Sequence, residues 1–586
     1  MSSKPKRFHT AVASVFIMAG FIHAEPVHPN LFFGMEDVPR LQAKVQGDTW
    51  IAEAFKVLEA RAEDYLAVPT DPYPYTGDHN GRGTVGRALE KKTGTLAFMG
   101  YLTGEDKYFR KAVDMVVAAA LQSDPEDHGV WLTHLQVGDG ARGYAVAYDL
   151  LYPHMDETRR AIVREEVRKF GELLYECDTC WGKPAPGVSS CNHNAVHFGA
   201  LGLCALVLGD QPQWQARATG RIRDFFKYAM DSTGYFTEGH SYANYGLLGA
   251  LPYSHALQRL GGPDLVAEQP FMEKMTDQFC WKLLPGGGEM LVLNDNAADL
   301  GNAGMLIYSI SRYGQPEALW SWLRAVGKTY GIGVDRYQGD GLSVPYAILW
   351  GDPEIEPINP SKTGKALSHR FASGRVFMRD SWDDPLGTLA SFTSGVDFHR
   401  GHNHQDENAF TFHAKGEAFA IDPGYWPKGT RSHNTMLVDG IGQIGASRGR
   451  ILEYEDLGDA VYVKGQAPEA YEWPDLLLGH FQRQVLFGRA EQPYVLIVDD
   501  LQCENDRAAR YTWLLHTDKE NKISVPKEGN RAVITGKKCG GLCDVIFLAG
   551  DVELAETDLK GETFNRRGRD YECSRFYKEL KAETTA

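Results

Sequence analysis

Apolar residues recur every three to four positions through most of residues 25–345. This spacing places them on one face of a helix and predicts a series of helices of moderate length. Turns that contain Gly or Pro separate the segments, and short connections favour antiparallel neighbours. The pattern therefore predicts a helical solenoid or a closed α/α toroid. The predicted helices are Val85–Leu102, Tyr108–Leu121, Ala141–Leu151, Thr158–Leu174, Asn194–Leu208, Trp214–Met230, Tyr242–Leu260, Pro270–Leu284, Ala303–Tyr313 and Pro316–Val326.

The pattern changes after Pro345. Residues 346–366 are rich in Gly, Pro and Lys and are predicted to be a linker. In residues 367–586 short apolar runs alternate with turn residues, which is typical of an antiparallel β-sandwich. The predicted fold is α+β and multidomain, and a cleft between its two domains is a natural ligand site. The predicted strands are Arg375–Met378, Thr388–Phe392, Ala409–His413, Ala418–Ile421, Thr435–Val438, Ala460–Lys464, Gln484–Leu486, Tyr494–Asp499, Tyr511–Leu515, Ala532–Ile534 and Asp544–Leu548.

Residues 1–24 have the composition of a secretory signal peptide. A basic start precedes the largely apolar stretch Thr10–Ile22, and Ala24 is a small residue at the expected cleavage point. The alternative is a single N-terminal membrane anchor. No later stretch of about 18 apolar residues occurs, so we expect no membrane span in the mature chain and a periplasmic or secreted location. Export would permit short disulfides, which we expect at Cys177–Cys180 and Cys539–Cys543.

The overall composition excludes several classes of protein. The chain has 586 residues, of which 43% are hydrophobic and 24% are charged, so it is neither disordered nor fibrous. Its formal net charge is −16 and it has no long basic stretch, so we expect no nucleic-acid partner. An acidic substrate is still compatible with this charge, because a cleft can be locally positive.

The densest group of chemically active residues lies in the predicted β-sandwich. Five His and two Asp occur between His399 and His433. Neutral imidazoles together with a carboxylate suit Zn²⁺ or a similar divalent cation. The proposed ligands are His404, Asp422 and His433. The alternative is that these His side chains cap turns or form hydrogen bonds in the core.

Two polar clusters lie in the helical half. Asn192, His193 and Asn194 open an apolar predicted helix, where Asn194 is alternatively an ordinary N-cap. His240 and Tyr242 belong to the second cluster, whose run of Glu, His, Ser, Tyr and Asn is too polar for an ordinary core face. Both clusters are therefore candidates for substrate contact.

Taken in order, these motifs resemble the heparinase II/III-like polysaccharide lyases, which include alginate lyases of related fold. The resemblance spans roughly residues 28–500, and the family's fold implies an α/α toroid followed by an antiparallel β-sandwich. The stretches that carry it are His28–Phe33, Cys191–Val196 with Gly199–Leu201, Glu238–Tyr242, Phe371–Trp382, Gly401–Asp406, Gly416–Glu417, Asp422–Gly424 and Ser432–Thr435.

The resemblance implies β-elimination at a uronic acid. Asn192 and His193 would neutralise the substrate carboxylate. Tyr242 would protonate the departing O4 and could serve as base as well, and His402 is the second catalytic group, a better base near neutral pH. The resemblance also places one structural divalent ion, Zn with Mn or Ca as alternatives, on the three ligands named above. The candidate substrate contacts are Arg82, His134, Asn194, His240 and Asn294.

The leading hypothesis is a secreted lyase that acts on an acidic, uronate-containing polysaccharide. A glycosaminoglycan (heparan sulfate, chondroitin sulfate or hyaluronan) is favoured, and alginate is the alternative substrate. A glycoside hydrolase of α/α-toroid fold would instead use Glu238 and Asp295 as a carboxylate pair. A non-catalytic saccharide-binding protein would need neither Tyr242 nor His402. The sequence leaves the oligomeric state open.

Overall fold

The computed structural model describes residues 27–70, 88–122, 135–176, 190–301, 303–326, 343–395, 402–445, 448–474, 476–504, 507–527, 529–548, 552–559, 563–566, 569–572 and 578–585. The predicted signal peptide, Cys177–Cys180, Arg82 and His134 lie outside these residues. No helix in the described ranges is both long and apolar enough to cross a membrane.

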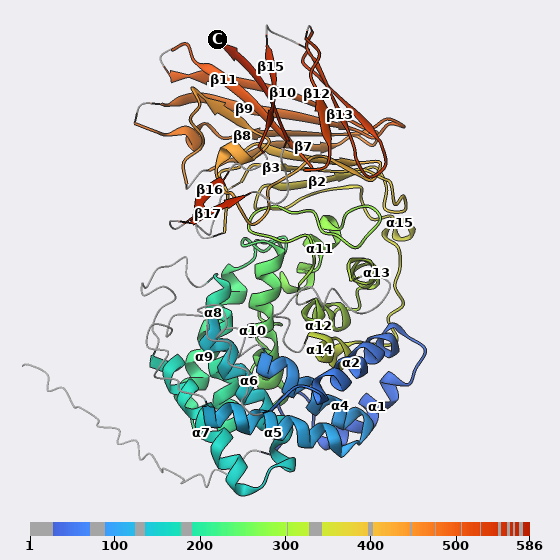
Figure 1. The fold of residues 1–586 in the computed structure, drawn as a ribbon, viewed down its shortest axis with the longest axis vertical. Coiled ribbons are helices and arrows are strands. Elements are labelled where there is room, and N and C mark those ends of the chain that lie inside the picture. The colour runs from blue at the N-terminus through green and yellow to red at the C-terminus, as the bar shows by residue number, and fades with distance from the viewer. Residues whose placement is uncertain are drawn as a thin grey trace, which may run out of the picture.

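The N-terminal part of the described chain, here called the helical region, is built of helices as predicted (Figure 1). Two departures stand out: the helix α2 (Trp50–Leu66) has no counterpart among the predicted helices, and within Pro270–Leu284 only a 3-10 turn and the short helix α11 (Asp277–Lys282) form. The chain leaves that helix at Leu283, which forms a β-bridge with Met290. The α-helices are α1 (Val38–Val45), α2 (Trp50–Leu66), α4 (Thr95–Thr103), α5 (Asp106–Gln122), α6 (Leu135–Leu151), α7 (Glu157–Glu176), α8 (Asn192–Leu208), α9 (Pro212–Tyr228), α10 (His240–Arg259), α11 (Asp277–Lys282), α12 (Gly304–Arg312), α13 (Pro316–Ala325), α14 (Ser343–Trp350) and α15 (Pro360–Thr363).

Helix α8 is the centre of the helical region. Every residue of α8 is buried, and it packs against α6, α9 and α10. Gly199 of α8 and Gly249 of α10 let the two backbones approach closely, since a Cβ on Gly199 would overlap the carbonyl oxygen of Gly249. This contact fixes the position of the first turn of α8 relative to the first turn of α10.

The C-terminal part, here called the sheet region, consists of strands whose pairings are all antiparallel among the described residues. The sheets have the strand orders β1-β2-β3-β4-β5, β10-β9-β8-β7, β15-β18-β11-β6, β12-β13-β14 and β16-β17. The strands are β1 (Ser368–Arg370), β2 (Arg375–Arg379), β3 (Leu389–Thr393), β4 (Ala409–Ala414), β5 (Glu417–Ala420), β6 (Met436–Val438), β7 (Arg450–Asp456), β8 (Ala460–Gln466), β9 (Leu478–Gly488), β10 (Tyr494–Cys503), β11 (Arg510–Thr517), β12 (Lys522–Ser524), β13 (Arg531–Thr535), β14 (Leu542–Ile546), β15 (Glu553–Asp558), β16 (Thr563–Arg566), β17 (Arg569–Glu572) and β18 (Lys578–Thr585).

The five-stranded sheet joins the two regions, because its central strands are buried on both faces. One face, with Val376 and Phe392, packs in a core shared with β8 and β9. The other face, with Phe377, packs against Trp281 and Leu293 of the helical region. In Figure 1, β2 and β3 accordingly lie between the helices and β7–β9. The loops that follow these strands are thereby brought to the helical region.

Two sequence expectations differ from the structure in their details. The segment 346–366, expected as a linker, contains the end of α14 and the one-turn helix α15. The expected disulfide Cys539–Cys543 is not formed, and both residues are free cysteines. Cys543 lies on β14 with its side chain against the core, whereas Cys539 is exposed in the turn before that strand.

Candidate active site

The two regions meet at an aromatic pair. The ring of His402, from the loop before β4, lies flat on the ring of Tyr242 in the first turn of α10, with centroids 3.6 Å apart and planes at 10°. The Tyr242 hydroxyl donates to the hydroxyl of Tyr425, 2.9 Å away. Tyr425 is exposed on its other side. Two predicted catalytic groups from distant parts of the sequence therefore share one site.

Burial makes Tyr242 a weak acid and its phenolate a strong base. Removal from water raises the pKa of Tyr242 well above its ordinary value, and Tyr425, Asp295 and Glu238 add to the shift. The neutral phenol is therefore the dominant form at ordinary pH. A neutral phenol is a proton donor, which suits the role of general acid better than that of resting base.

Glu238 connects His402 to the start of α8. Its Oε1 lies 2.7 Å from Nδ1 of His402, and its Oε2 accepts from the backbone N–H of Asn192 at 2.6 Å. Glu238 is only 4% exposed. One buried carboxylate thus contacts the sheet region and the helical region at once.

Asp295 makes a second connection between the regions. Its Oδ1 lies 2.9 Å from Nε2 of His404, and Lys428 donates to its Oδ2. The backbone N–H of Asp295 also donates to the carbonyl of His402. Asp295 is buried, so these contacts form away from solvent. Asp295 and Glu238 together anchor the loop that carries His402 and His404 to the helical region.

Asn192 and His193 lie at the buried N-terminal end of α8. The side-chain amide of Asn192 is fully buried, and neither its oxygen nor its nitrogen has a hydrogen-bond partner. An unsatisfied buried amide is costly, and a bound ligand would remove that cost. A bound substrate would supply the hydrogen-bond partners that the Asn192 amide lacks.

The three predicted metal ligands come together. Each of the three residues, His404, Asp422 and His433, offers one ligand atom, and these atoms all lie within 4.8 Å of one another. All three residues are buried. Nδ1 of His404 and Nε2 of His433 have no hydrogen-bond partner. Burial opposes a charge on Asp422, but the hydrogen bond and charge of His433, together with His404 and the backbone N–H of Gly424, outweigh it and lower the pKa of that carboxyl. The donor set is that of a divalent cation such as Zn²⁺.

Two other predicted substrate contacts, Asn194 and His240, form hydrogen bonds within the helical region. Asn194 is not the N-cap of α8, since Cys191 holds that position, and its amide donates to the carbonyl of Arg221. His240 is fully buried with Nε2 on the carbonyl of Ala297, and burial lowers its pKa to about 3. It therefore ties α10 to the loop between α11 and α12 as a neutral ring.

Asn294 adopts a left-handed backbone conformation with φ of 63° and is buried. Its amide has no hydrogen-bond partner, and it lies one residue before Asp295. The chain bends at Asn294 and Asp295, and the side chain of Asp295 joins the two regions.

Sequence reasoning gives no role to Tyr425 or Lys428. The available signal for Tyr425 is its place three residues after the predicted ligand Asp422, beyond a Pro-Gly turn. Glu238 and Asp295 enter only as a hydrolase pair, because a sequence does not show that each carboxylate faces a His from the other region. These partners are set by the docking of the two regions.

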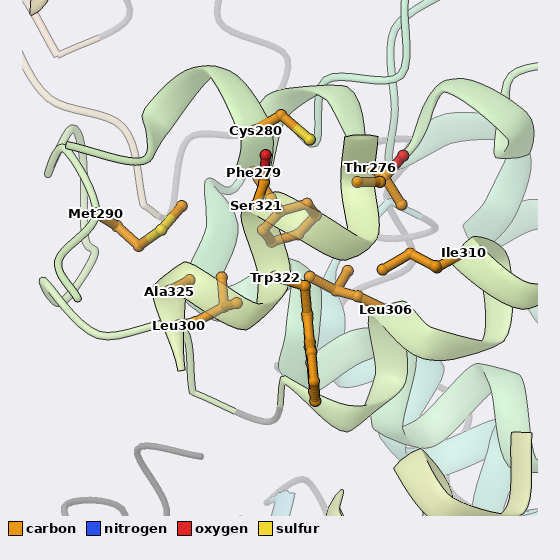
Figure 2. A pocket seen from close by; sticks show the side chains of 11 residues that line it. Thr276, Phe279, Cys280, Met290, Leu300, Leu306, Ile310, Ser321, Trp322 and Ala325 are labelled. Carbon is orange, nitrogen blue, oxygen red and sulfur yellow. The ribbon is translucent and has the colours of Figure 1, made fainter. Parts of the chain in front are cut away.

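The pocket shown in Figure 2 is separate from this site. It lies between α11, α12 and α13 and is lined mainly by apolar side chains such as Phe279, Leu306 and Trp322. A second small cavity is lined by Asp422 and His433, next to the predicted metal ligands. Only the second cavity is close to the chemically active residues.

Comparisons with known proteins agree with the resemblance drawn from the motifs. Residues 389–557 match the family model "Heparinase II/III-like, C-terminal". The structure is similar to a mutant of heparan sulfate lyase HepC from Pedobacter heparinus, with a TM-score of 0.58 and 16% identity over 95% of this chain and 90% of that chain. It is also similar to heparinase III, with a TM-score of 0.61 and 13% identity over 96% of this chain and 92% of that chain.

These matches confirm the predicted resemblance to heparinase II/III-like polysaccharide lyases, through the family model in the sheet region and through a similar fold over both regions of the chain. At 13–16% identity, the structural comparisons establish a shared fold. The activity is argued from the site.

Proposed function

We propose that this protein is a polysaccharide lyase that cleaves a uronate-containing polysaccharide by β-elimination. The single observation that carries the proposal is the stacked pair of Tyr242 and His402, which brings a proton donor and a base to one place. The favoured substrate class is a glycosaminoglycan: heparan sulfate, chondroitin sulfate or hyaluronan. Alginate is the alternative. In this proposal the helical region is an α/α toroid and the sheet region an antiparallel β-sandwich.

The first requirement of the reaction is a more acidic C5 proton. The uronate carboxylate must lose its negative charge to hydrogen bonds, so that charge can build up on it as the proton leaves. The unsatisfied amide of Asn192 supplies donors for this, with His193 beside it at the start of α8. Fixed donors in a site without water stabilise such developing charge by several kcal/mol, roughly 3–4 per donor.

The second requirement is a base and an acid on the same substrate. His402 takes the C5 proton, the C5–H electron pair forms the C4–C5 double bond, and the C4–O4 bond breaks. Tyr242 gives its hydroxyl proton to the departing O4. The raised pKa of Tyr242 favours this assignment, because the phenol holds its proton until a basic alkoxide forms.

A divalent ion, most consistent with Zn²⁺, would be held by His404, Asp422 and His433. Bound there, the ion would supply positive charge that fixes the loop before β4. The unpartnered buried nitrogens of the two His rings support this assignment. His404 also contacts Asp295 through Nε2, so the loop is held from its other side. The metal is therefore proposed as structural.

The hydrolase alternative requires two carboxyl groups that are free to act on a glycosidic bond. Glu238 accepts hydrogen bonds from His402 and Asn192, and Asp295 accepts from His404 and Lys428. Both carboxylates are buried and engaged on both oxygens. This disfavours the hydrolase and leaves the lyase as the better account.

The composition of residues 1–24 supports a periplasmic or secreted lyase, and mass spectrometry of the protein from its host would locate the mature N-terminus. The substrate class is tested with heparan sulfate, chondroitin sulfate, hyaluronan and alginate. The ultraviolet absorbance of the 4,5-unsaturated uronate is followed on each polymer. A rise on a glycosaminoglycan supports the proposal, a rise on alginate alone selects the alternative substrate, and no rise on any of the four argues against it.

A further inference from the structure

The backbone that follows Glu238 is tightly constrained. It precedes Gly239, whose backbone φ of 84° favours glycine and where a Cβ would overlap the Asn296 side chain. The chain then enters α10, which carries Tyr242 in its first turn. The carboxylate thus comes from the same turn as Tyr242 and faces His402.

The hydrogen bond to Glu238 determines which nitrogen of His402 carries the proton. A buried carboxylate only accepts hydrogen bonds, so Nδ1 of His402, 2.7 Å from Oε1, must be the protonated nitrogen. In the neutral ring the lone pair is then on Nε2. The stacking on Tyr242 fixes the plane in which that lone pair points.

The other oxygen of Glu238 positions a second group of the site. The backbone N–H of Asn192 is at the first position of α8 and has no partner within the helix. Glu238 Oε2 accepts from it at 2.6 Å. The same carboxylate thereby sets the distance between His402 and the amide that would receive the substrate carboxylate.

We propose that Glu238 is a positioning residue that holds His402 as the Nδ1-protonated tautomer and aligns its Nε2 with Asn192. This inference rests on the proposed lyase function. Glu238 itself does not contact the substrate, since both of its oxygens are engaged. The role is that of a carboxylate that orients a catalytic imidazole, here placed at the junction between two regions of the chain.

A double-mutant cycle tests the role in catalysis. Glu238→Gln leaves one acceptor for two donors, so kcat on the responsive polymer falls about 10- to 100-fold, while KM changes little. In a His402→Ala background the same change costs less than about twofold, because Glu238 acts through His402. A purely structural Glu238 would lower the activity by a similar factor in both backgrounds, which would overturn the proposal.

A second measurement keeps the test independent of activity. In protein with ¹⁵N-labelled histidine, assigned with His402→Gln, the nitrogen shifts of His402 report its tautomer. Wild-type protein is expected to show Nδ1–H, and Glu238→Gln to show a mixture or Nε2–H. The matched control is Asp295→Asn, which removes the neighbouring carboxylate and leaves the His402 tautomer unchanged.

An Nε2–H signal in wild-type protein, or an unchanged tautomer in Glu238→Gln, would overturn the proposal. If Glu238→Gln does not fold, Glu238→Asp replaces it, since the shorter side chain cannot reach both Nδ1 of His402 and the N–H of Asn192. If wild-type protein cleaves no polymer, the proposed function fails, and the ¹⁵N spectrum still decides whether Glu238 sets the tautomer.

Discussion

The imidazole of His402 lies parallel to the phenol of Tyr242, with ring centroids 3.6 Å apart. One residue belongs to the sheet region and the other to the helical region, so the pair exists only when the two regions are docked. In the proposed reaction the acid and the base therefore come from different regions. The buried seam formed by Phe377 with Trp281 and Leu293 is therefore part of what assembles the site.

Removal of the Tyr242 hydroxyl tests the assignment of the general acid. Tyr242→Phe retains the ring that stacks on His402 and removes only the proton donor. We expect kcat to fall about 10²- to 10⁴-fold on the responsive polymer, with the melting temperature close to that of wild type. Tyr425→Phe is the matched control, expected to stay within about tenfold, since it removes only the acceptor of the Tyr242 hydroxyl. Equal losses in the two variants would refute the assignment.

Metal binding at the predicted site should raise the stability of the folded protein. Elemental analysis of purified protein should find about one divalent ion per chain, and His433→Ala should lose it. Chelation should lower the melting temperature of wild-type protein, and addition of Zn²⁺ should restore it, because an ion that binds only the folded state stabilises that state. Protein that is free of metal, fully active and unaffected by chelators would contradict the site.

The contact between α8 and α10 depends on the absence of a side chain at Gly199. Gly199→Ala would drive a methyl group into the backbone oxygen of Gly249, which cannot move without shifting the helix. We expect a loss of about 3 kcal/mol or more in the free energy of unfolding, above the usual overpacking cost. Urea denaturation measures it, with Gly220→Ala on α9 as the control, because a Cβ there meets no neighbour. Equal stability of the two variants would contradict the packing.

The buried Glu407 predicts a pH dependence of stability. Burial raises its pKa to about 8, against the opposing effect of Arg375. The pKa of Glu407 in the folded state lies above its unfolded value of 4.5. The stability that the neutral acid contributes is therefore fully present below pH 4.5 and is lost as pH rises to about 8.

Relative to wild type, Glu407→Gln should therefore gain stability between about pH 5 and pH 8, by at most about 1.4 kcal/mol per pH unit. Urea denaturation at a series of pH values measures the gain. Glu455→Gln, at an exposed position on β7, should show no such trend. A difference between wild type and Glu407→Gln that does not change with pH would show that Glu407 is ionised in the folded state.

Much of the fold follows from local pattern. Helices such as α5 and α9 have a strong apolar periodicity, and the sequence predicts them within a few residues. Strand β7 is not predicted, because four of its seven residues are charged and most are exposed, so tertiary pairing with β8 decides its conformation. Strand β18 is missed for the same reason, as its sequence KELKAETT has little apolar content.

One part of the candidate site can likewise be predicted from local sequence, and another part cannot. The ligand group of His404, Asp422 and His433 is predicted from residue types within a short stretch, and the structure brings these three together. The roles of Glu238 and Asp295 could not be predicted, since each depends on a His that lies more than a hundred residues later in the chain. Such pairings follow from the docking of two regions, which local sequence does not encode.

In the proposed reaction the C4–O4 bond is broken by elimination. The most direct test of this step is a paired measurement on the polymer that responds, which follows the ultraviolet absorbance of the unsaturated uronate and the number of new reducing ends in the same samples. Elimination yields one unsaturated end for each new reducing end, and both signals should be lost in Tyr242→Phe. New reducing ends without the ultraviolet signal would mean hydrolysis and would contradict the roles given to Tyr242 and His402.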